Sequence, residues 1–367
     1  MVSRRVGGAA QVAIALARAA SERGWRSQTW VPGPGPASKI LEAEKLPHRT
    51  IELEATDTST VHRVLTCGRL VLGLGRERRA IVHVHSTWMF GLIRPALSAA
   101  GARTIVHFHT DPDPPEIAWA LKRPPAHLIT CARYIERRLR SEIDRLGLAT
   151  GVTAIPNAVD LERLVPGDRL VARGRLGLCP PDRFVILMLA NLSPHKGQST
   201  AVRALHALTR RGVRAELWIA GENRTAGTYE HELHQLAAGL GVTADVRFLG
   251  FRSDAPLLLQ AANVFLLPSA IEGLPLSVLE AQAAGVPVVG SNIPGMLEII
   301  EDGVTGFTLA TDDVDGYADR LFAIHERPEL AHRLTEAAGR RVRQEHAWKA
   351  YEERTFGVYA AVGERLS

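Results

Sequence analysis

The feature that most constrains the fold of this chain is a regular alternation of short apolar runs with longer segments of helical spacing. Apolar runs that predict strands lie near residues 27–31, 50–53, 80–85, 104–109, 127–131 and 152–155, and again near 184–190, 214–220, 246–249, 264–268, 286–290 and 306–309. Such alternation is typical of parallel βαβ units and indicates the α/β class. At 367 residues, the chain is long enough for two domains.

The alternation of predicted strands and helices is interrupted between Pro156 and Pro181, where Asn, Asp, Gly and Pro residues are frequent. This composition predicts a connector. We therefore expect a first domain over residues 1–165, a second over 178–345, and a C-terminal helix over 346–367 that could return to the first domain. Each domain should hold a doubly wound parallel sheet, and the two should face each other across a cleft, with ligands beyond the carboxyl ends of the strands.

Composition narrows the function classes. The chain is 46% hydrophobic and 23% charged, and its three cysteines form no CxxC pair, so neither a disulfide framework nor a cysteine zinc site is expected. A cytoplasmic protein fits this cysteine usage, and no apolar run reaches the ~18–20 residues of a membrane-spanning helix. The formal charge of +5 suggests an anionic partner. Nucleic acid is disfavoured because only 5% of residues are aromatic, which leaves few stacking platforms.

The most informative stretch runs from Asn263 to Asn292. A buried strand should end at Pro268, a loop carries Glu272-Gly273-Leu274, and Pro275 opens a helix before the next strand. Free N–H groups at the start of that helix suit a phosphate, and Gly273 allows close approach of the backbone. Glu280 follows within the helix, where its carboxylate could accept hydrogen bonds from ribose hydroxyls.

A second informative stretch, residues 184–197, places Lys196 just before a helix start. The helix dipole disfavours a cation there by roughly 0.3–1 kcal/mol. A diphosphate held between Lys196 and the helix after Gly273 would remove this conflict, and the lysine would stabilise charge on a departing group.

Residues 189–197 (LANLSPHKG) and 270–295 (AIEGLPLSVLEAQAAGVPVVGSNIPG) resemble the retaining glycosyltransferases of family 4. Shorter matches are Gly7-Gly8 before a helix, IPNAVD, IAGEN and VRFLGF. The resemblance implies the GT-B fold of two facing Rossmann-like domains. It also implies transfer of a sugar from a nucleotide diphosphate-sugar, such as a UDP- or GDP-sugar, to a hydroxyl of a saccharide or lipid-linked acceptor. The expected role is cell-surface polysaccharide or glycolipid synthesis, with no metal or redox cofactor.

The resemblance also assigns roles to residues. It implies that Lys196 binds the diphosphate, Glu272 the donor sugar and Glu280 the ribose, and that His109 faces the sugar while His85 lies near the acceptor. The full set implied for donor binding is Gly7, Gly8, Asn191, Lys196, Phe251, Arg252, Gly273, Leu274 and Glu280, and the catalytic set is Glu272, His109 and Lys196. Asn191 departs from the family pattern, which often has arginine there, so we expect a weaker diphosphate contact at this position.

The histidines leave an alternative open. His83 and His85 end one predicted strand and His107 and His109 end the next, each pair on one side of its strand. Without the family, two such pairs suggest a zinc site and a metal-dependent hydrolase. Against a metal site, the sequence offers no ligand from a third strand and no carboxylate beyond Asp111 and Asp113. The DxD triplet that these two residues form is expected to be a turn. A sugar-nucleotide epimerase and a non-catalytic binding protein are further alternatives.

Two further expectations concern the first domain. Arginines gather at Arg76, Arg78 and Arg79 and at Arg133, Arg137, Arg138 and Arg140; with Leu139, Ile143 and Leu146 nearby, the second group could lie peripherally on an anionic membrane. The family's glycine loop normally follows a buried strand. Residues 1–6 are too short and basic for one, so the first strand is expected to be missing.

Overall fold

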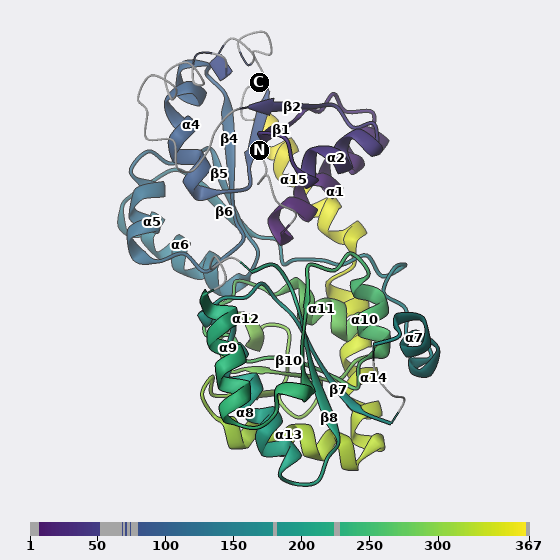
Figure 1. The fold of residues 1–367 in the computed structure, drawn as a ribbon. Coiled ribbons are helices and arrows are strands. Elements are labelled where there is room, and N and C mark those ends of the chain that lie inside the picture. Colours follow the sequence, from purple (N-terminus) through teal and green to yellow (C-terminus); the bar gives the residue numbers. More distant parts are fainter. Residues whose placement is uncertain are drawn as a thin grey trace. The chain divides into compact units, whose positions relative to one another are not determined.

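The computed structural model describes residues 7–51, 68, 70, 71, 74, 80–178, 182–223 and 228–364. The chain divides into two compact units (Figure 1): residues 1–156 with 349–367 form the first, and residues 157–348 form the second. Both units contain parallel strands joined by helices. The α/β class expected from the alternating pattern is confirmed.

The first unit contains a four-stranded sheet and a separate pair of strands. Its elements are α1 (Gly8–Glu22), β1 (Thr29–Pro32), α2 (Pro36–Ala43), β2 (His48–Ile51), β3 (Ile81–Val84), α4 (Thr87–Ala99), β4 (Arg103–Phe108), α5 (Pro114–Leu121), β5 (His127–Thr130), α6 (Arg133–Arg145), β6 (Gly151–Ala154) and α15 (Trp348–Glu364). The larger sheet has the order β3-β4-β5-β6, and β1 pairs with β2; all pairings are parallel. The carboxyl ends of β3 and β4 are therefore neighbours.

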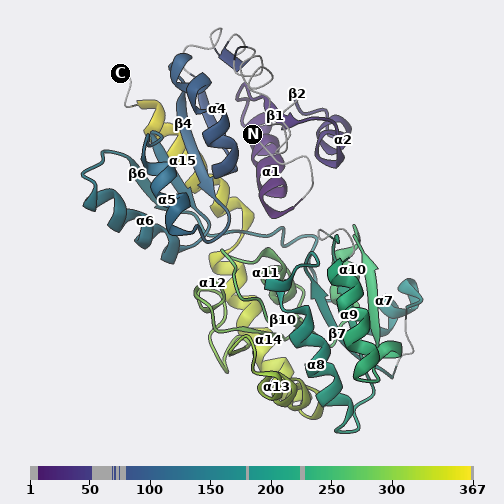
Figure 2. The ribbon, with the colours of Figure 1, turned by 60° about the vertical axis from the view of Figure 1, so that its left-hand side comes forward.

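The last helix, α15, packs on the first unit (Figure 2). The Phe356 ring meets Trp25, just beyond α1, edge-on with ring centroids 5.0 Å apart, and the hydroxyl of Tyr359 lies 2.7 Å from Nδ1 of His83 on β3. These contacts explain why a C-terminal segment far along the chain belongs to the N-terminal unit.

Two expectations about the first unit fall outside the described residues. Residues 1–6, where a missing first strand was expected, are among the residues that the structure does not describe, as are Arg76, Arg78 and Arg79. The described part begins at Gly7, whose carbonyl accepts hydrogen bonds from the amides of Ala10 and Gln11 at the start of α1.

The second unit contains a six-stranded parallel sheet flanked by helices. Its elements are α7 (Arg169–Leu176), β7 (Phe184–Leu189), η1 (Pro194–Lys196), α8 (Gln198–Thr209), β8 (Ala215–Ala220), α9 (Thr228–Gly239), η2 (Thr243–Asp245), β9 (Val246–Gly250), α10 (Ala255–Ala261), β10 (Val264–Leu267), α11 (Leu276–Ala283), β11 (Val288–Ser291), α12 (Pro294–Leu297), β12 (Phe307–Leu309), α13 (Val314–Glu326) and α14 (Pro328–Glu345). Strands β7 and β10 lie in the centre of the sheet and are fully buried, apart from Leu189 at the end of β7, which is partly exposed.

The strand order of this sheet is β12-β11-β10-β7-β8-β9. The chain runs outward from β7 through β8 and β9, then returns to the other side of β7 and runs outward again through β10, β11 and β12. The direction of winding thus reverses between β7 and β10. In open parallel sheets, ligands bind beyond the carboxyl ends of the strands at such a reversal. The turns after β7 and β10 are therefore the parts of this unit best placed to bind a ligand.

The structure differs from the expected connector between residues 156 and 181. Residues 157–165, expected in the first domain, belong to the second unit, and α7 forms within the segment read as irregular. Asp168 caps α7 by accepting from the amides of Leu170 and Val171, and the guanidinium of Arg173 donates to Ala261 and Asn263. These polar contacts, together with α7 packing on α10, attach the segment to the second unit.

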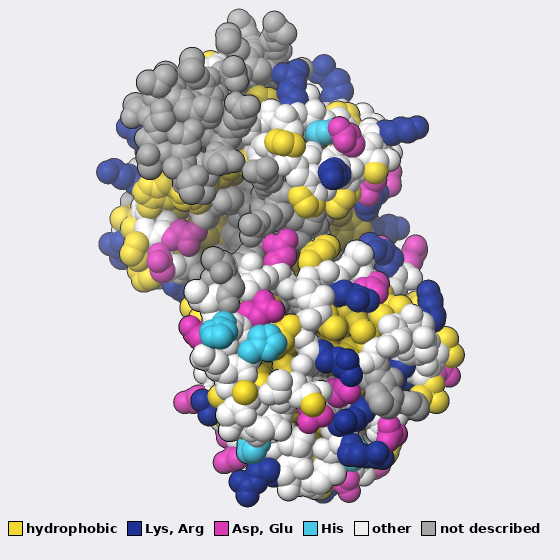
Figure 3. Space-filling model, in the orientation of Figure 1, with side chains coloured by type: hydrophobic (Ala, Val, Ile, Leu, Met, Phe, Trp, Pro, Cys, Tyr) yellow, Lys and Arg dark blue, Asp and Glu magenta, His cyan; other side chains and the backbone are white. Residues whose placement is uncertain are grey.

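Two features of the described residues relate to the expected membrane and anionic partners: the length of the apolar helices and the distribution of surface charge. No helix among the described residues is both long and apolar enough to cross a membrane. Figure 3 shows basic and acidic side chains interspersed over the face of the second unit drawn there. The second unit also contains ion pairs such as Arg211 with Asp319. On that face, the positive charge of the chain is therefore not gathered into one field.

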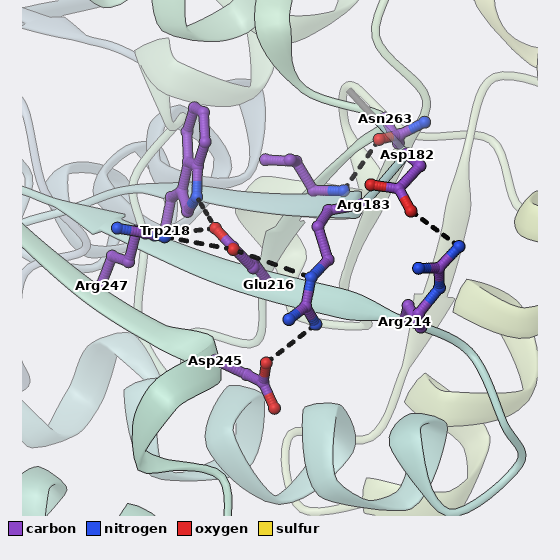
Figure 4. Close-up of polar contacts among 9 residues, drawn as sticks. Asp182, Arg183, Arg214, Glu216, Trp218, Asp245, Arg247 and Asn263 are labelled. Atoms are coloured by element: carbon purple, nitrogen blue, oxygen red, sulfur yellow. Dashed lines mark hydrogen bonds and ion pairs between the residues drawn. The ribbon is translucent and has the colours of Figure 1, made fainter. Parts of the chain in front are cut away.

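A buried carboxylate, Glu216 on β8, organises a polar cluster inside the second unit (Figure 4). Its side chain is 3% exposed and accepts hydrogen bonds from Arg247 at 2.8 Å and from the Trp218 indole at 3.0 Å, with Arg183 at 4.0 Å. Burial by itself would raise the pKa of Glu216, but these donors and charges outweigh burial and hold it below its ordinary value. The carboxylate is therefore ionised and paired in the folded protein.

We expect Glu216→Gln to lower the free energy of unfolding by about 1–3 kcal/mol, because Arg247 and Arg183 lose the carboxylate that they share while the shape is kept. Arg183 keeps its pair with Asp245. Asp182→Asn is the control: Asp182 pairs with Arg214 in the same region, but the two side chains are 46% and 72% exposed, so its loss should cost less than about 0.5 kcal/mol. Denaturant unfolding measures both changes. Equal losses would contradict the assigned role of Glu216.

The ion pairs of Glu216 also predict that the effect of Glu216→Gln on the free energy of unfolding depends on pH. The folded pKa of Glu216 lies below the unfolded value of 4.5, so its contribution is present above that pH and is lost as the pH falls through the folded pKa. The stability difference between the wild type and Glu216→Gln should therefore shrink on acidification. A difference that stays constant down to pH about 3 would contradict the ion pair.

Candidate functional site

Two turns at the switch between β7 and β10 are joined directly. The turn after β7 carries Asn191 to Gly197, and the turn after β10 carries Ser269 to Pro275. The amide of Ala270 donates to the carbonyl of His195 at 2.8 Å, and Nζ of Lys196 donates to Oε1 of Glu272 at 2.7 Å. The structure thus brings together the lysine and the carboxylate that the sequence predicted separately.

Two glycines allow other segments to approach β10 and the turn after it closely. Gly197 has φ +75°, and a Cβ there would lie 2.1 Å from the carbonyl oxygen of Pro268. Gly295, which belongs to α12, would place a Cβ 2.1 Å from the carbonyl oxygen of Gly273. A larger residue at Gly197 would push the turn after β7 away from the end of β10, so the Lys196–Glu272 contact depends on this glycine. A larger residue at Gly295 would displace α12 or the loop that carries Glu272 and Gly273.

The ion pair lies in a partly sheltered position. The side chains of Lys196 and Glu272 are 21% and 10% exposed. Lys196 ends the short helix η1, and Gly197 is the N-cap of α8, where the dipole of α8 disfavours a cation. The Glu272 carboxylate supplies compensating negative charge, a role that the sequence analysis gave to a bound diphosphate alone.

Backbone donors gather beside this pair at the start of α11. Among the described residues, no hydrogen bond within the chain uses the backbone N–H groups of Gly273, Leu274 or Leu276, and Pro275 at the N-cap has none to offer. Helix starts leave such donors for water or an anion. Together with Lys196, they form a site with the chemistry of phosphate binding.

Asn157 holds this loop in place, and sequence reasoning missed it. Its buried Nδ2 donates to the carbonyl of Leu274 at 2.7 Å, while its own carbonyl lies 2.7 Å from Nδ1 of His346. The sequence shows Asn157 only as part of IPNAVD. A side chain that reaches a backbone atom 117 residues away leaves no periodic signal.

Glu280 is half-buried on α11. Burial raises its pKa to about 7, and the charge of Arg163 only partly opposes this effect. A carboxyl group that titrates near neutrality is ready to ionise when hydroxyl donors reach it, which fits the predicted contact with a ribose.

The other predicted donor-site residues of the second unit occupy defined positions. Oδ1 of Asn191 accepts from the amide of Glu222 at 3.2 Å, so this side chain already positions the turn after β8 and keeps its Nδ2 group as a donor. Phe251 is 61% exposed just beyond β9. Arg252 forms a double hydrogen bond with Asp254 at 2.7 and 2.5 Å, which fixes the guanidinium.

In the first unit, four histidine rings gather at the carboxyl ends of β3 and β4, with His83 and His107 inside the strands and His85 and His109 directly after them. Nδ1 of His85 lies 3.0 Å from Nε2 of His109. The rings of His107 and His109 stack with centroids 3.9 Å apart, and those of His83 and His85 lie 4.0 Å apart with a tilt of 33°. Burial lowers the pKa of His109 to about 3 and the pKa values of the other three well below 6.5. The four imidazoles are therefore neutral at physiological pH.

The remaining polar groups of this region have structural roles. Asp113 is the N-cap of α5 and accepts from the amide of Glu116 at 2.7 Å, while Asp111 pairs with Arg138. The turn expected for this DxD triplet thus leads into a helix, and neither carboxylate is directed to a metal by its partners. Gly7 and Gly8 begin α1.

The expected membrane face of α6 is wrong. Leu139 and Ile143 are 0% and 4% exposed and belong to the core, and only Leu146, beyond the helix end, is 44% exposed. Two of the arginines are also engaged within the unit, Arg138 with Asp111 and Arg140 with Glu136. The helix therefore has no apolar side chains along its length to insert into a bilayer.

Comparison with known proteins gives a consistent assignment. The family model Glycosyltransferase Family 4 matches residues 6–163, and the model Glycosyl transferases group 1 matches residues 177–341. HepE from Anabaena, solved with UDP and glucose, superposes with a TM-score of 0.87 at 20% identity, covering 98% of each chain. This likeness confirms the expected GT-B fold.

Curated relatives extend the comparison. The D-inositol 3-phosphate glycosyltransferase of Saccharomonospora viridis is 33% identical over 61% of this chain and 57% of its own length. This chain spans little more than half the length of several curated relatives that it matches. The D-inositol 3-phosphate glycosyltransferase 2 of Catenulispora acidiphila is 31% identical over 80% of this chain and 68% of its own. With the two family models, this relationship shows that the chain belongs to glycosyltransferase family 4.

Proposed function

We propose that this chain is a retaining glycosyltransferase that moves a sugar from a nucleotide diphosphate-sugar to a hydroxyl acceptor. The observation that carries the proposal is the Lys196–Glu272 pair at the switch point of the second unit. Beside it lie the backbone amides of Gly273, Leu274 and Leu276, which no hydrogen bond among the described residues uses. One cation and several backbone donors suit a diphosphate, and a carboxylate beside them suits the hydroxyls of a sugar.

In the proposed reaction, the bond between the anomeric carbon and the diphosphate oxygen breaks, and the acceptor oxygen bonds to that carbon from the same face. The departing diphosphate carries away the electron pair and takes the acceptor's proton. Lys196 and the amides at the start of α11 stabilise the negative charge that develops on it. These groups are fixed before the donor arrives, so little reorganisation is required during the reaction.

Glu272 and His109 would position the sugar in this scheme. Glu272 is held by Lys196 and can accept hydrogen bonds from sugar hydroxyls with its carboxylate. The neutral imidazole of His109 would hydrogen-bond the sugar, and His85, 3.0 Å from it, would lie toward the acceptor. Glu280 would accept from the ribose, and Asn191, Phe251 and Arg252 would complete the nucleotide site. We assign no metal or redox cofactor to the transfer step.

The substrate class is also part of the proposal. HepE has been solved with UDP-glucose, and one of the matched relatives is the glycogen synthase of Mycobacterium tuberculosis, which support a UDP-sugar as the first donor to test and a role in polysaccharide or glycolipid synthesis. The relatives named for D-inositol 3-phosphate support a phosphorylated polyol among the acceptors.

We expect Lys196→Ala to reduce kcat/KM for the sugar nucleotide at least tenfold, about 1.4 kcal/mol, because the departing diphosphate loses its cation. Lys39→Ala, on an exposed position of α2, is the matched control and should leave the rate unchanged. The assay follows release of nucleoside diphosphate and formation of glycosylated acceptor. Full activity in Lys196→Ala would refute the assignment.

The same assay separates the alternatives. An epimerase would convert the nucleotide sugar in the absence of acceptor, whereas a transferase requires acceptor to form a glycoside. Retention predicts a product with the anomeric configuration of the donor, read by the proton coupling at the anomeric carbon. Activity that disappears with chelator would favour a metal-dependent reaction.

The raised pKa of Glu280 predicts a pH-dependent affinity for nucleotide. Ribose hydroxyls favour the ionised carboxylate, which forms as the pH rises through about 7. Affinity for the nucleoside diphosphate should therefore rise by up to about tenfold between about pH 6 and pH 8. In Glu280→Gln this component should vanish, while any change due to titration of the phosphate remains. Identical pH profiles for the two proteins would contradict the role of Glu280.

A further inference from the structure

The histidine cluster of the first unit has a geometry that the proposed transfer reaction does not require. His83 and His85 come from β3, and His107 and His109 come from β4, which pairs with β3 in parallel. The proposed function uses His85 and His109. It gives no role to His83 or His107, although their rings stack at 5.4 Å with an interplanar angle of 3°.

The side chain of His107 is the one that most strongly indicates a bound ligand. His107 is 1% exposed, and neither Nδ1 nor Nε2 has a hydrogen-bond partner among the residues that the structure describes. A buried polar group without a partner is costly, and native structures rarely tolerate one without an ion, a water or a functional reason. A neutral imidazole with an unused ring nitrogen is a metal ligand in its binding-ready form.

Three of the imidazoles are close enough to share one ion. One ring nitrogen from each of His83, His85 and His107 lies within 4.8 Å of the others. Around a tetrahedral ion with bonds of about 2.0–2.1 Å, ligand nitrogens are about 3.3 Å apart. Small rotations of the side chains therefore suffice to close the site. The third-strand ligand whose absence argued against a metal is not needed, because two strands supply three ligands.

The outer contacts of two of these rings are those of metal-bound histidines. Nδ1 of His83 lies 2.7 Å from the Tyr359 hydroxyl, and Nδ1 of His85 lies 3.0 Å from Nε2 of His109. In metal sites, one ring nitrogen binds the ion while the other hydrogen-bonds an outer partner that fixes the ring. Binding through Nε2 would use both arrangements without breaking either hydrogen bond.

We propose that His83, His85 and His107 form a binding site for one zinc-class divalent cation, with water in the fourth position. Imidazole ligands favour Zn²⁺, Cu²⁺ and Ni²⁺ over Mg²⁺ and Ca²⁺. When the ion is bound, His85 must carry its proton on Nδ1 and donate it to Nε2 of His109, so the ion sets the tautomer of His109. This last consequence rests on the proposed role of His109 in sugar binding; the metal site itself does not.

The test uses the full chain without a histidine tag, stripped with chelator and then titrated with Zn²⁺ or Co²⁺. The wild type should retain one Zn²⁺ per chain after desalting, and Co²⁺ should give visible absorption bands of an imidazole-bound ion. His107→Leu should lose both signals. His48→Gln, whose ring contacts the Leu46 carbonyl outside the cluster, should keep them.

Folding is checked independently of the metal. His107→Leu removes an unpartnered buried imidazole, so the stripped variant should unfold at or above the temperature of the stripped wild type. Tyr359→Phe keeps all three ligands and should weaken Zn²⁺ binding about 10–100-fold. In the wild type, Zn²⁺ but not Mg²⁺ should raise the unfolding temperature. No retained Zn²⁺, or equal retention by His107→Leu, would overturn the proposal whatever the result of the transferase assay.

Discussion

The ion pair between Lys196 and Glu272 joins two turns that are 76 residues apart in sequence but adjacent in the sheet. It exists because the chain returns after β9 to place β10 beside β7, which brings the two carboxyl ends together. Gly197 then lets the turn after β7 reach the backbone at the end of β10, and Gly295 lets α12 pack on the turn that carries Glu272. The strand order thus determines which residues meet, and the glycines determine how closely. The proposed donor site follows from these two constraints.

The polar groups around this pair are only partly used by contacts among the described residues. Glu280 is held in surroundings that raise its pKa to about 7, and backbone donors at the start of α11 have no acceptor within the described chain. Elsewhere in the same unit, the buried Glu216 has its full set of donors. The contrast separates a carboxylate that stabilises the fold from one to which the proposed function assigns a ligand.

Much of the arrangement of strands and turns around the site was predictable from the sequence, because it depends on the pattern of neighbouring residues. Apolar runs located β7 and β10, and Glu272 and Lys196 stood in turns after them. Contacts made through side chains over long distances were not predictable: Asn157 reaches the Leu274 carbonyl, and α7 attaches to the second unit through Arg173. The arginines of α6 suggested a membrane-binding face. That prediction failed because the apolar side of the helix, Leu139 and Ile143, is buried in the core. Charge spacing alone does not show which side of a helix is covered.

The most direct test of the central claim is a thermal-shift comparison of the wild type with uridine, guanosine and adenosine diphosphates and with the matching nucleosides. A diphosphate at 100 times its Kd should stabilise the protein by ~2.7 kcal/mol, whereas the nucleoside, which leaves Lys196 and the α11 amides unused, should give little or no shift. A protein that responds to none of the diphosphates, or equally to the nucleoside, would contradict the account of this site.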